Sequence, residues 1–192
     1  EFRRVLFRSL RGMYLYAPAT IKSKKNVQLL ASGVGVNWAL KAQKLLAEDF
    51  DIAASVWSVT SWNELRRDGL AVDRHNMLNP QDQRSAFITR KLDGAKGPVI
   101  AVSDFMRAVQ EQIAPWVTQP FSTLGTDGFG LSDTRGALRR HFKVDAESIV
   151  ISTLQQLAAQ GEIKPKLVQE AIDKYQINDV RAAEAGNTEG SG

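Results

Sequence analysis

The chain has 192 residues, of which 43% are hydrophobic and 24% are charged, and it contains no cysteine. This length and composition predict one globular domain with a sizeable core, and the lack of cysteine excludes disulfide frameworks, thiolate zinc sites and cysteine nucleophiles. No apolar run approaches ~18 residues, so the sequence predicts no membrane-spanning helix and no membrane partner.

The net charge of +4 comes from the amino-terminal region. Residues 1–25 contain seven Lys or Arg and one acid, so the remaining 167 residues carry 18 basic and 20 acidic side chains. A nucleic-acid-binding domain usually spreads its basic side chains over the folded surface, so we expect no nucleic-acid partner. Residues 1–11 lack the apolar core of a secretory signal. We interpret them as a junction, with a native arm packed on a neighbouring domain as the alternative.

The first half of the body alternates between strand and helix patterns. Residues 27–31 (VQLLA) form a compact apolar run closed by residues 32–35 (SGVG), as in a buried strand that enters a turn. From Val36 to Phe50, apolar residues recur at helical intervals. Residues 55–60 (SVWSVT) are rich in strand-forming side chains, and Ser61 is a suitable N-cap for the helix that follows.

The next stretch repeats this alternation. Residues 98–102 (PVIAV) predict a third strand, and Asp104 is a suitable N-cap for a helix over residues 105–114, which Pro115 ends or kinks. Residues 121–125 (FSTLG) predict a short fourth strand, which runs into a glycine-rich loop. The expected helix carries apolar side chains on one face at positions 105, 106, 109 and 113.

Three helical patterns fill the remaining body. Ser132 or Asp133 is expected to cap the first helix, Asp145 the second, and Pro165 to open the third, while Gly161 ends the second. Strand–helix alternation with uninterrupted apolar strands predicts a mostly parallel sheet covered by helices on both faces. The fold class is therefore a single three-layer α/β domain.

Motifs for catalysis and cofactors are weak or missing. Residues 32–35 begin like a dinucleotide-binding loop, but Trp38 stands where a third glycine allows close helix–strand packing, which favours a plain tight turn. The sequence has no G-x-S-x-G, no G-x-x-x-x-G-K-[ST] and no H-E-x-x-H motif. His75 and His141 lie on separate segments, as expected for a loop histidine and a surface helix histidine, and no metal site is predicted.

Charged residues surround the glycine-rich loop. Asp127 and Asp133 flank it and are candidate catalytic carboxylates, although an Asp beside a turn more often accepts turn amides or caps a helix. Arg135, Arg139 and Arg140 share the next helix; we expect a solvated face, with anion binding or pairing with a neighbouring domain as the alternatives. The residues alone predict no catalytic, cofactor or metal site.

Two longer strings resemble one enzyme family. Residues 58–69 (SVTSWNELRRDG) resemble its S-V-T-S-x-x-E-L-x-R-D-G stretch, and residues 124–133 (LGTDGFGLSD) resemble its L-G-T-D-G-F-G-x-S-D loop; residues 141–145 continue the match. The family is the decarboxylating component of the pyruvate dehydrogenase complex in its homodimeric bacterial form. Residues 75–80 (HNMLNP) depart from its W-N-x-L-H-P pattern, so no role of that histidine transfers to Asn79.

The resemblance runs from about Gly12 to Asn178 and implies a transketolase C-terminal-like domain over residues 12–178, followed by a disordered tail over residues 179–192. Family enzymes decarboxylate pyruvate on thiamine diphosphate, held with Mg²⁺ between two other domains of opposite subunits. They pass the acetyl group to the lipoyl group of the dihydrolipoyl acetyltransferase core. The family's Gly-Asp-Gly…Asn motif does not occur here, so this segment is expected to be inactive alone and to hold no cofactor.

The resemblance also implies the partners of this domain, which are its own catalytic domains and a second subunit of a homodimer. The contact is predicted at the glycine-rich loop, through Thr126, Asp127, Gly128, Phe129, Gly130, Ser132 and Asp133. Four tryptophans are suitable core residues, and a few of them are further candidate interface anchors toward the other domains: Trp38, Trp57, Trp62 and Trp116.

Three alternatives remain at this stage. The first is that the chain is the equivalent domain of a transketolase or a 2-oxoglutarate dehydrogenase. The second is a stand-alone module that binds a nucleotide at residues 33–35, and the third is a pure interaction domain. A cysteine-free chain without a secretion signal is expected to be cytoplasmic.

Overall fold

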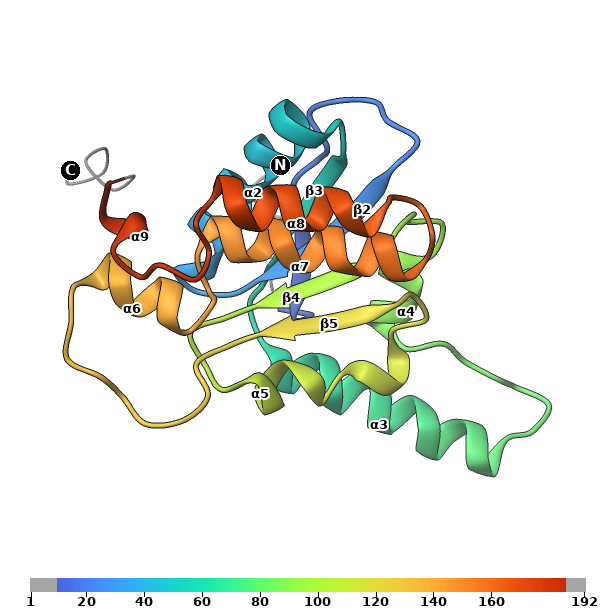
Figure 1. The fold of residues 1–192 in the computed structure, drawn as a ribbon. Coiled ribbons are helices and arrows are strands. Elements are labelled where there is room, and N and C mark those ends of the chain that lie inside the picture. Colours follow the sequence, from blue (N-terminus) through green and yellow to red (C-terminus); the bar gives the residue numbers. More distant parts are fainter. Residues whose placement is uncertain (1–9, 186–192) are drawn as a thin grey trace.

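The computed structural model of the chain describes residues 10–185. A central sheet has helices packed against both of its faces, which gives three layers (Figure 1). The predicted three-layer α/β fold is thus confirmed. The expected junction over residues 1–11 falls almost entirely on residues 1–9, which lie outside the described part of the chain.

The sheet has five strands in the order β1-β3-β2-β4-β5. They are β1 (Met13–Ala17), β2 (Asn26–Ala31), β3 (Ala53–Val59), β4 (Val99–Val102) and β5 (Phe121–Leu124). β1, which was not predicted, is antiparallel to β3 at one edge, and the other strands are parallel. The chain passes from β2 to β3, which lies on one side of β2, and then crosses to β4, which lies on the other side of β2. Ligands of open parallel sheets gather beyond the carboxyl ends of strands at such a reversal.

The helices divide between the two faces. They are α2 (Gly35–Phe50), α3 (Trp62–Leu78), α4 (Phe87–Leu92), α5 (Arg107–Glu111), α6 (Arg135–His141), α7 (Ala146–Ala159), α8 (Pro165–Lys174) and α9 (Ala182–Ala185). α2, α7 and α8 cover one face, and α3, α4 and α5 cover the other (Figure 1). α6 lies beyond the carboxyl ends of β4 and β5 (Figure 1).

Successive residues of the central strands face two separate cores. In β2, Leu29 belongs to the core beneath α2 and α7, whereas Leu30 belongs to the core beneath α3 and α4. Ile100 and Ala101 in β4 divide in the same way. Because neighbouring side chains of a strand point to opposite faces and both faces are covered, these strands are apolar throughout.

Local signals placed several helix ends correctly. The Ser61 hydroxyl accepts the amide of Glu64 at 3.1 Å, and the Asp145 carboxylate accepts the amide of Ser148 at 3.0 Å, so both predicted N-caps are confirmed. Gly161 has a φ of +75°, a value that suits glycine at a helix end. Pro165 is the first residue of α8, as predicted.

The predicted helix over residues 105–114 is wrong in extent. α5 begins only at Arg107, and its first amide is accepted at 2.9 Å by the carboxylate of Asp127, twenty residues further along the chain, not by Asp104. Phe105 and Met106 therefore precede the helix, and each is 55% exposed. The segment departs from the prediction because a partner distant in sequence supplies its cap.

Two further local predictions are wrong. Thr134, not Ser132 or Asp133, caps α6, because its hydroxyl accepts the amide of Ala137 at 3.3 Å. His75 lies in the last turn of α3 instead of in a loop. Helix α9 lies within residues 179–192, the segment expected to be a disordered tail; residues 186–192 are outside the described part, so the tail stays a prediction.

Candidate interaction site at the carboxyl edge of the sheet

Four strand ends converge where the direction of winding reverses. The segments that leave them are residues 32–34 after β2, 60–61 after β3, 103–106 after β4 and 125–134 after β5. α6 and the amino-terminal ends of α2 and α3 complete this carboxyl edge of the sheet (Figure 1). The loop that resembled a family motif in the sequence is the longest of these segments.

A buried hydroxyl network fixes the centre of this edge. The hydroxyl groups of Ser32 and Ser103 lie 2.9 Å apart, and the Trp62 indole N–H donates to the Ser32 hydroxyl at 3.0 Å. The Ser103 hydroxyl also accepts the amide of Phe105 at 3.1 Å. Since buried hydroxyl groups are costly without partners, this network holds the ends of β2 and β4 and the start of α3 in one arrangement. Sequence inspection gave no role to either serine.

The base of the 125–134 loop is locked to the segment after β4. The amide of Thr126 donates to the carbonyl of Phe105 at 3.0 Å, and its hydroxyl donates to the carbonyl of Asp104 at 2.6 Å. A side chain at Gly125 would place its Cβ 2.5 Å from the Phe105 carbonyl oxygen, so glycine is required there. Together with the Asp127 bond to Arg107, these contacts join the two segments into one rigid unit.

The tip of the loop projects from this base. Phe129 is 95% exposed, and it lies between Gly128, which has a φ of +93°, and Gly130. Ser132 is exposed, and the Asp133 carboxylate accepts the amide of Thr134 at 2.7 Å at the start of α6. The predicted contact residues thus form one continuous segment, with Thr126 and Asp127 at its base and Phe129 at its tip.

Exposed apolar side chains gather at this edge. Each follows β2, β4 or β5, and the exposed fractions are 54% for Val34, 55% for Phe105, 55% for Met106, 95% for Phe129 and 54% for Leu131. Scattered single apolar residues are normal on a surface, but several large ones on segments that leave neighbouring strands make this edge a candidate interaction surface. We call these five residues the edge patch.

Two cavities open at the same edge. The larger, about 930 Å³, lies between the ends of β2 and β3 and the start of α5, and its lining includes Ser32, Trp62 and Asp104. The smaller, about 240 Å³, lies between the start of α2 and α6. Asp104 borders both.

The acidic residues of the edge are arranged for structure. Asp127 and Asp133, the candidate catalytic carboxylates, each accept a backbone amide, and within residues 10–185 no group of three or more His, Asp or Glu side chains could hold a metal ion. The donor set near the loop therefore does not fit a diphosphate-bound magnesium ion, which requires several fixed oxygen ligands.

The amino-terminal end of α2 offers little to a nucleotide. The amides of Gly35, Val36 and Asn37 already donate to carbonyls of residues 32–34 at 3.0–3.3 Å. Anion binding at a helix start depends on amides that lack such partners. The geometry favours the plain tight turn expected from the sequence.

The other predicted candidates are dispersed. His75 lies near Asp82 at the far end of α3, with 3.0 Å between its Nε2 and the carboxylate, whereas His141 is exposed on α6. Trp57, Trp62 and Trp116 are buried in the core and do not serve as exposed anchors. Only Trp38 of the four is part-exposed, and it lines the smaller cavity.

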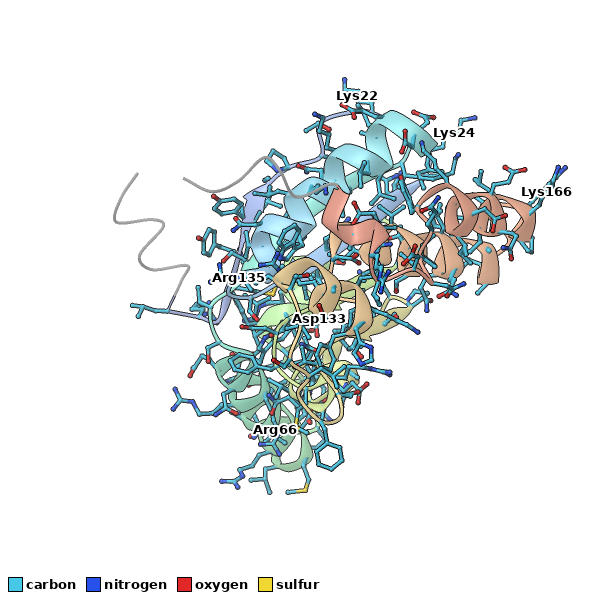
Figure 2. All side chains as sticks on the ribbon, turned by 60° about the vertical axis from the view of Figure 1, so that its left-hand side comes forward. Lys22, Lys24, Arg66, Asp133, Arg135 and Lys166 are labelled. Atoms are coloured by element: carbon cyan, nitrogen blue, oxygen red, sulfur yellow. The ribbon has the colours of Figure 1, made fainter. Side chains whose placement is uncertain are left out.

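Charged side chains lie on several sides of the described part of the chain. Figure 2 shows Asp133 and Arg135 far from Lys22 and Lys24, and Lys166 and Arg66 lie at two further corners. Within the described residues, no helix is both long enough and apolar enough to cross a membrane.

A family model described as the transketolase-like C-terminal domain matches residues 12–145. The chain belongs to this family. The match begins directly before β1 and ends at the cap of α7, so it includes the whole sheet and the carboxyl edge. The fold expected from the resemblance is therefore confirmed.

Curated relatives carry the name that the resemblance predicted. The chain is 54% identical over 175 residues to the pyruvate dehydrogenase E1 component of Mycolicibacterium smegmatis, covering 91% of this chain and 19% of the relative. It is 51% identical over 181 residues to that of Mycobacterium tuberculosis, covering 94% of this chain and 20% of the relative. It is 42% identical over 167 residues to that of Escherichia coli K12, covering 85% of this chain and 19% of the relative. The chain thus spans about a fifth of the length of these relatives.

Solved transketolases share the fold. One from Pichia stipitis, in complex with sedoheptulose-7-phosphate, aligns with a TM-score of 0.53 and 20% identity, covering 82% of this chain and 19% of that chain. A split-gene transketolase described as an inactive β4 tetramer aligns with a TM-score of 0.51 and 21% identity, covering 76% of this chain and 41% of that chain. Identities this low support the architecture alone.

Proposed function

We propose that this chain is the C-terminal domain of a thiamine diphosphate-dependent pyruvate dehydrogenase, and that its carboxyl edge packs against the catalytic domains of that enzyme. The full enzyme would decarboxylate pyruvate and pass the acetyl group to the lipoyl group of a dihydrolipoyl acetyltransferase core. In this proposal the enzyme is a cytoplasmic homodimer, and thiamine diphosphate and Mg²⁺ are bound by domains outside this chain. The domain itself contributes packing, not chemistry.

The observation that supports this proposal most strongly is the edge patch. Phe129 is almost fully exposed although the base of its loop is held rigidly, so the fold presents this side chain and does not bury it. Burying a Phe side chain contributes about 1.5–3 kcal/mol. A surface that displays Phe105, Met106 and Phe129 together suits a permanent contact with another domain.

A chimaeric enzyme tests the proposal. Residues 12–178 of this chain replace the matching segment of the Mycolicibacterium smegmatis relative, and we expect the chimaera to be dimeric and active on pyruvate. Phe129→Ser should weaken dimer formation or turnover by about 10- to 150-fold, because 1.4 kcal/mol corresponds to a factor of ten. Asp127→Ala should act in the same direction by loosening the base of the loop.

Met77→Ser is the matched control. Met77 is 75% exposed but lies near the carboxyl end of α3, away from the edge patch, so its removal should change neither measurement. The proposal is wrong if the chimaera is active and dimeric and both loop variants behave like this control. It is also wrong if the chimaera folds but neither dimerises nor acts on pyruvate.

A further inference from the structure

The larger cavity at the carboxyl edge has a single charged side chain among the described residues that line it. Its volume is about 930 Å³, within the range of about 300–1,000 Å³ that is typical of ligand pockets. It lies where the direction of winding reverses, which is where open parallel sheets bind their ligands. The charged residue is Asp104, and the other polar side chains of the lining are hydroxyl, amide and indole groups. The lining therefore suits a cationic or neutral ligand better than an anion.

The Asp104 carboxylate has no structural partner that would occupy it. The sequence predicted that it caps the following helix, but the amide of Arg107 donates to Asp127 instead. Within the described residues, no Lys, Arg or His nitrogen lies within 4.0 Å of the Asp104 carboxylate, and the Ser103 hydroxyl reaches it only at 3.5 Å. Because the residue is also exposed, its carboxylate is free to pair with a cation from outside the domain.

The position of this carboxylate in the cavity wall is fixed. The backbone carbonyls of Asp104 and Phe105 accept the hydroxyl and the amide of Thr126 at 2.6 and 3.0 Å. A Cβ at Gly33 would lie 3.5 Å from the Asp104 carboxylate oxygen, so the carboxylate lies beside Gly33, which lines the same cavity. Phe105 lines it too and is 55% exposed. A carboxylate and an aromatic side chain on one rigid wall are the groups that recognise an organic ammonium ion.

We propose that the larger cavity binds a small organic amine, whose ammonium group pairs with Asp104 while its apolar body packs against Phe105 and Val109. The amides of Asn63 and Gln112, which also line the cavity, can donate to or accept from further polar groups of the ligand. The cavity shares Phe105 with the edge patch, so a bound amine lies beside the docking contact proposed above. The inference needs only the cavity of this chain and does not rest on the identity of the full enzyme.

The test uses the 192-residue chain and three probes with one apolar body: 3-phenylpropylamine, 3-phenylpropan-1-ol and 3-phenylpropionate. Binding is followed by NMR through the indole N–H signals, because Trp62 lines the larger cavity and Trp38 lines the smaller one. The Trp62 N–H donates to the Ser32 hydroxyl in the wall of the larger cavity, so its signal reports a ligand there. The amine should shift the Trp62 signal and leave that of Trp38 in place. The neutral alcohol should bind at least about tenfold more weakly, since a charge-assisted hydrogen bond contributes more than a neutral one, and the acid should bind more weakly still.

Two variants assign the binding to one carboxylate. Asp104→Asn keeps the shape of the side chain but removes its charge, so it should weaken the amine about 10- to 100-fold and leave the alcohol unchanged. Asp133→Asn is the matched control; Asp133 is exposed at the same edge but lines neither cavity, so its effect should stay within about threefold. The proposal is overturned if the alcohol or the acid binds as tightly as the amine, or if the amine shifts Trp38 instead. It is also overturned if the amine binds Asp104→Asn as well as the unsubstituted chain, or shifts neither signal at millimolar concentration.

Discussion

Arg140 is the residue whose replacement tests the packing of α6 most severely. Its side chain is 3% exposed, and its Nε donates to the Asp145 carboxylate, which is 7% exposed and also caps α7. Its Nη1 donates to the carbonyls of Tyr175 and Gln176 at 3.0 and 3.2 Å, and its Nη2 lies 3.5 Å from the Glu147 carboxylate. One guanidinium thus joins α6, the start of α7 and the end of α8.

Replacing this arginine with methionine should destabilise the domain by about 3–5 kcal/mol. Methionine fills much of the same volume, but it leaves the Asp145 carboxylate buried without a cation, and loss of one partner of a buried pair costs about that much. Domains of this kind have a total stability of about 5–15 kcal/mol. The variant should therefore remain folded at low temperature but lose a large part of its stability.

Urea denaturation followed by circular dichroism measures the effect. With a slope of about 2–3 kcal/mol per molar urea, the midpoint of Arg140→Met should fall by about 1–2.5 M. Arg139→Met is the control, because that residue loses only its contact with Trp38, which contributes about 0.5–1 kcal/mol at an exposed site. The reasoning is refuted if the two variants unfold at the same urea concentration with equal slopes.

Three further substitutions have expected outcomes. Gly69→Ala should lower the free energy of unfolding by about 1–3 kcal/mol, because the alanine Cβ would lie 2.3 Å from the Trp116 ring. This effect should outweigh the better helix propensity of alanine. Equal or greater stability of the variant in urea denaturation would contradict this packing. Gln110→Met should raise the thermal midpoint, because both polar atoms of the Gln110 side chain are buried without partners, and an unpaired buried polar group costs about 1–3 kcal/mol; an unchanged or lower midpoint would refute this. Asp49→Asn should reduce the amount by which the free energy of unfolding falls in acid. Burial raises the pKa of Asp49, but the hydrogen bonds from Lys174 and Tyr175 outweigh this and lower it below its ordinary value. Asp49 thus stabilises the fold above the pKa that its carboxyl group has in the unfolded chain, and this stabilisation is lost as the pH falls through the lower pKa of the folded state. The difference in the free energy of unfolding between the two proteins should therefore shrink between about pH 5 and pH 2. A difference independent of pH would contradict that sign.

The strand and helix pattern was predictable because its causes are local. Ser61 and Asp145 accept amides only three residues away, and both caps were visible as a polar residue before an apolar helical pattern. The continuous apolar strands indicated a sheet buried on both faces, as the two cores show.

The errors arose where the partner is distant in sequence. Asp104 stood in the expected position before a helix, but Asp127 supplies that cap across twenty residues, and the helix starts later as a result. Strand β1 pairs with β3, more than thirty residues away, and a five-residue run gave no sign of that pairing.

The candidate site was predicted only in part. The loop over residues 126–133 was identified by its resemblance to a family string, and the structure presents Phe129 at its tip. The hydroxyl pair of Ser32 and Ser103 and the larger cavity beside Asp104 were not predicted. Each joins segments that are far apart in sequence, and no periodicity or spacing reports such a juxtaposition.

The central claim, that the carboxyl edge is the contact with the remainder of a longer enzyme, is tested most directly by amide hydrogen exchange. Exchange is compared between the isolated chain and the Mycolicibacterium smegmatis chimaera. The account predicts slower exchange in the chimaera at residues 103–107 and 125–134, and equal exchange at residues 79–85 beyond the far end of α3. Equal exchange at the edge, or protection confined to the far end of α3, would contradict it.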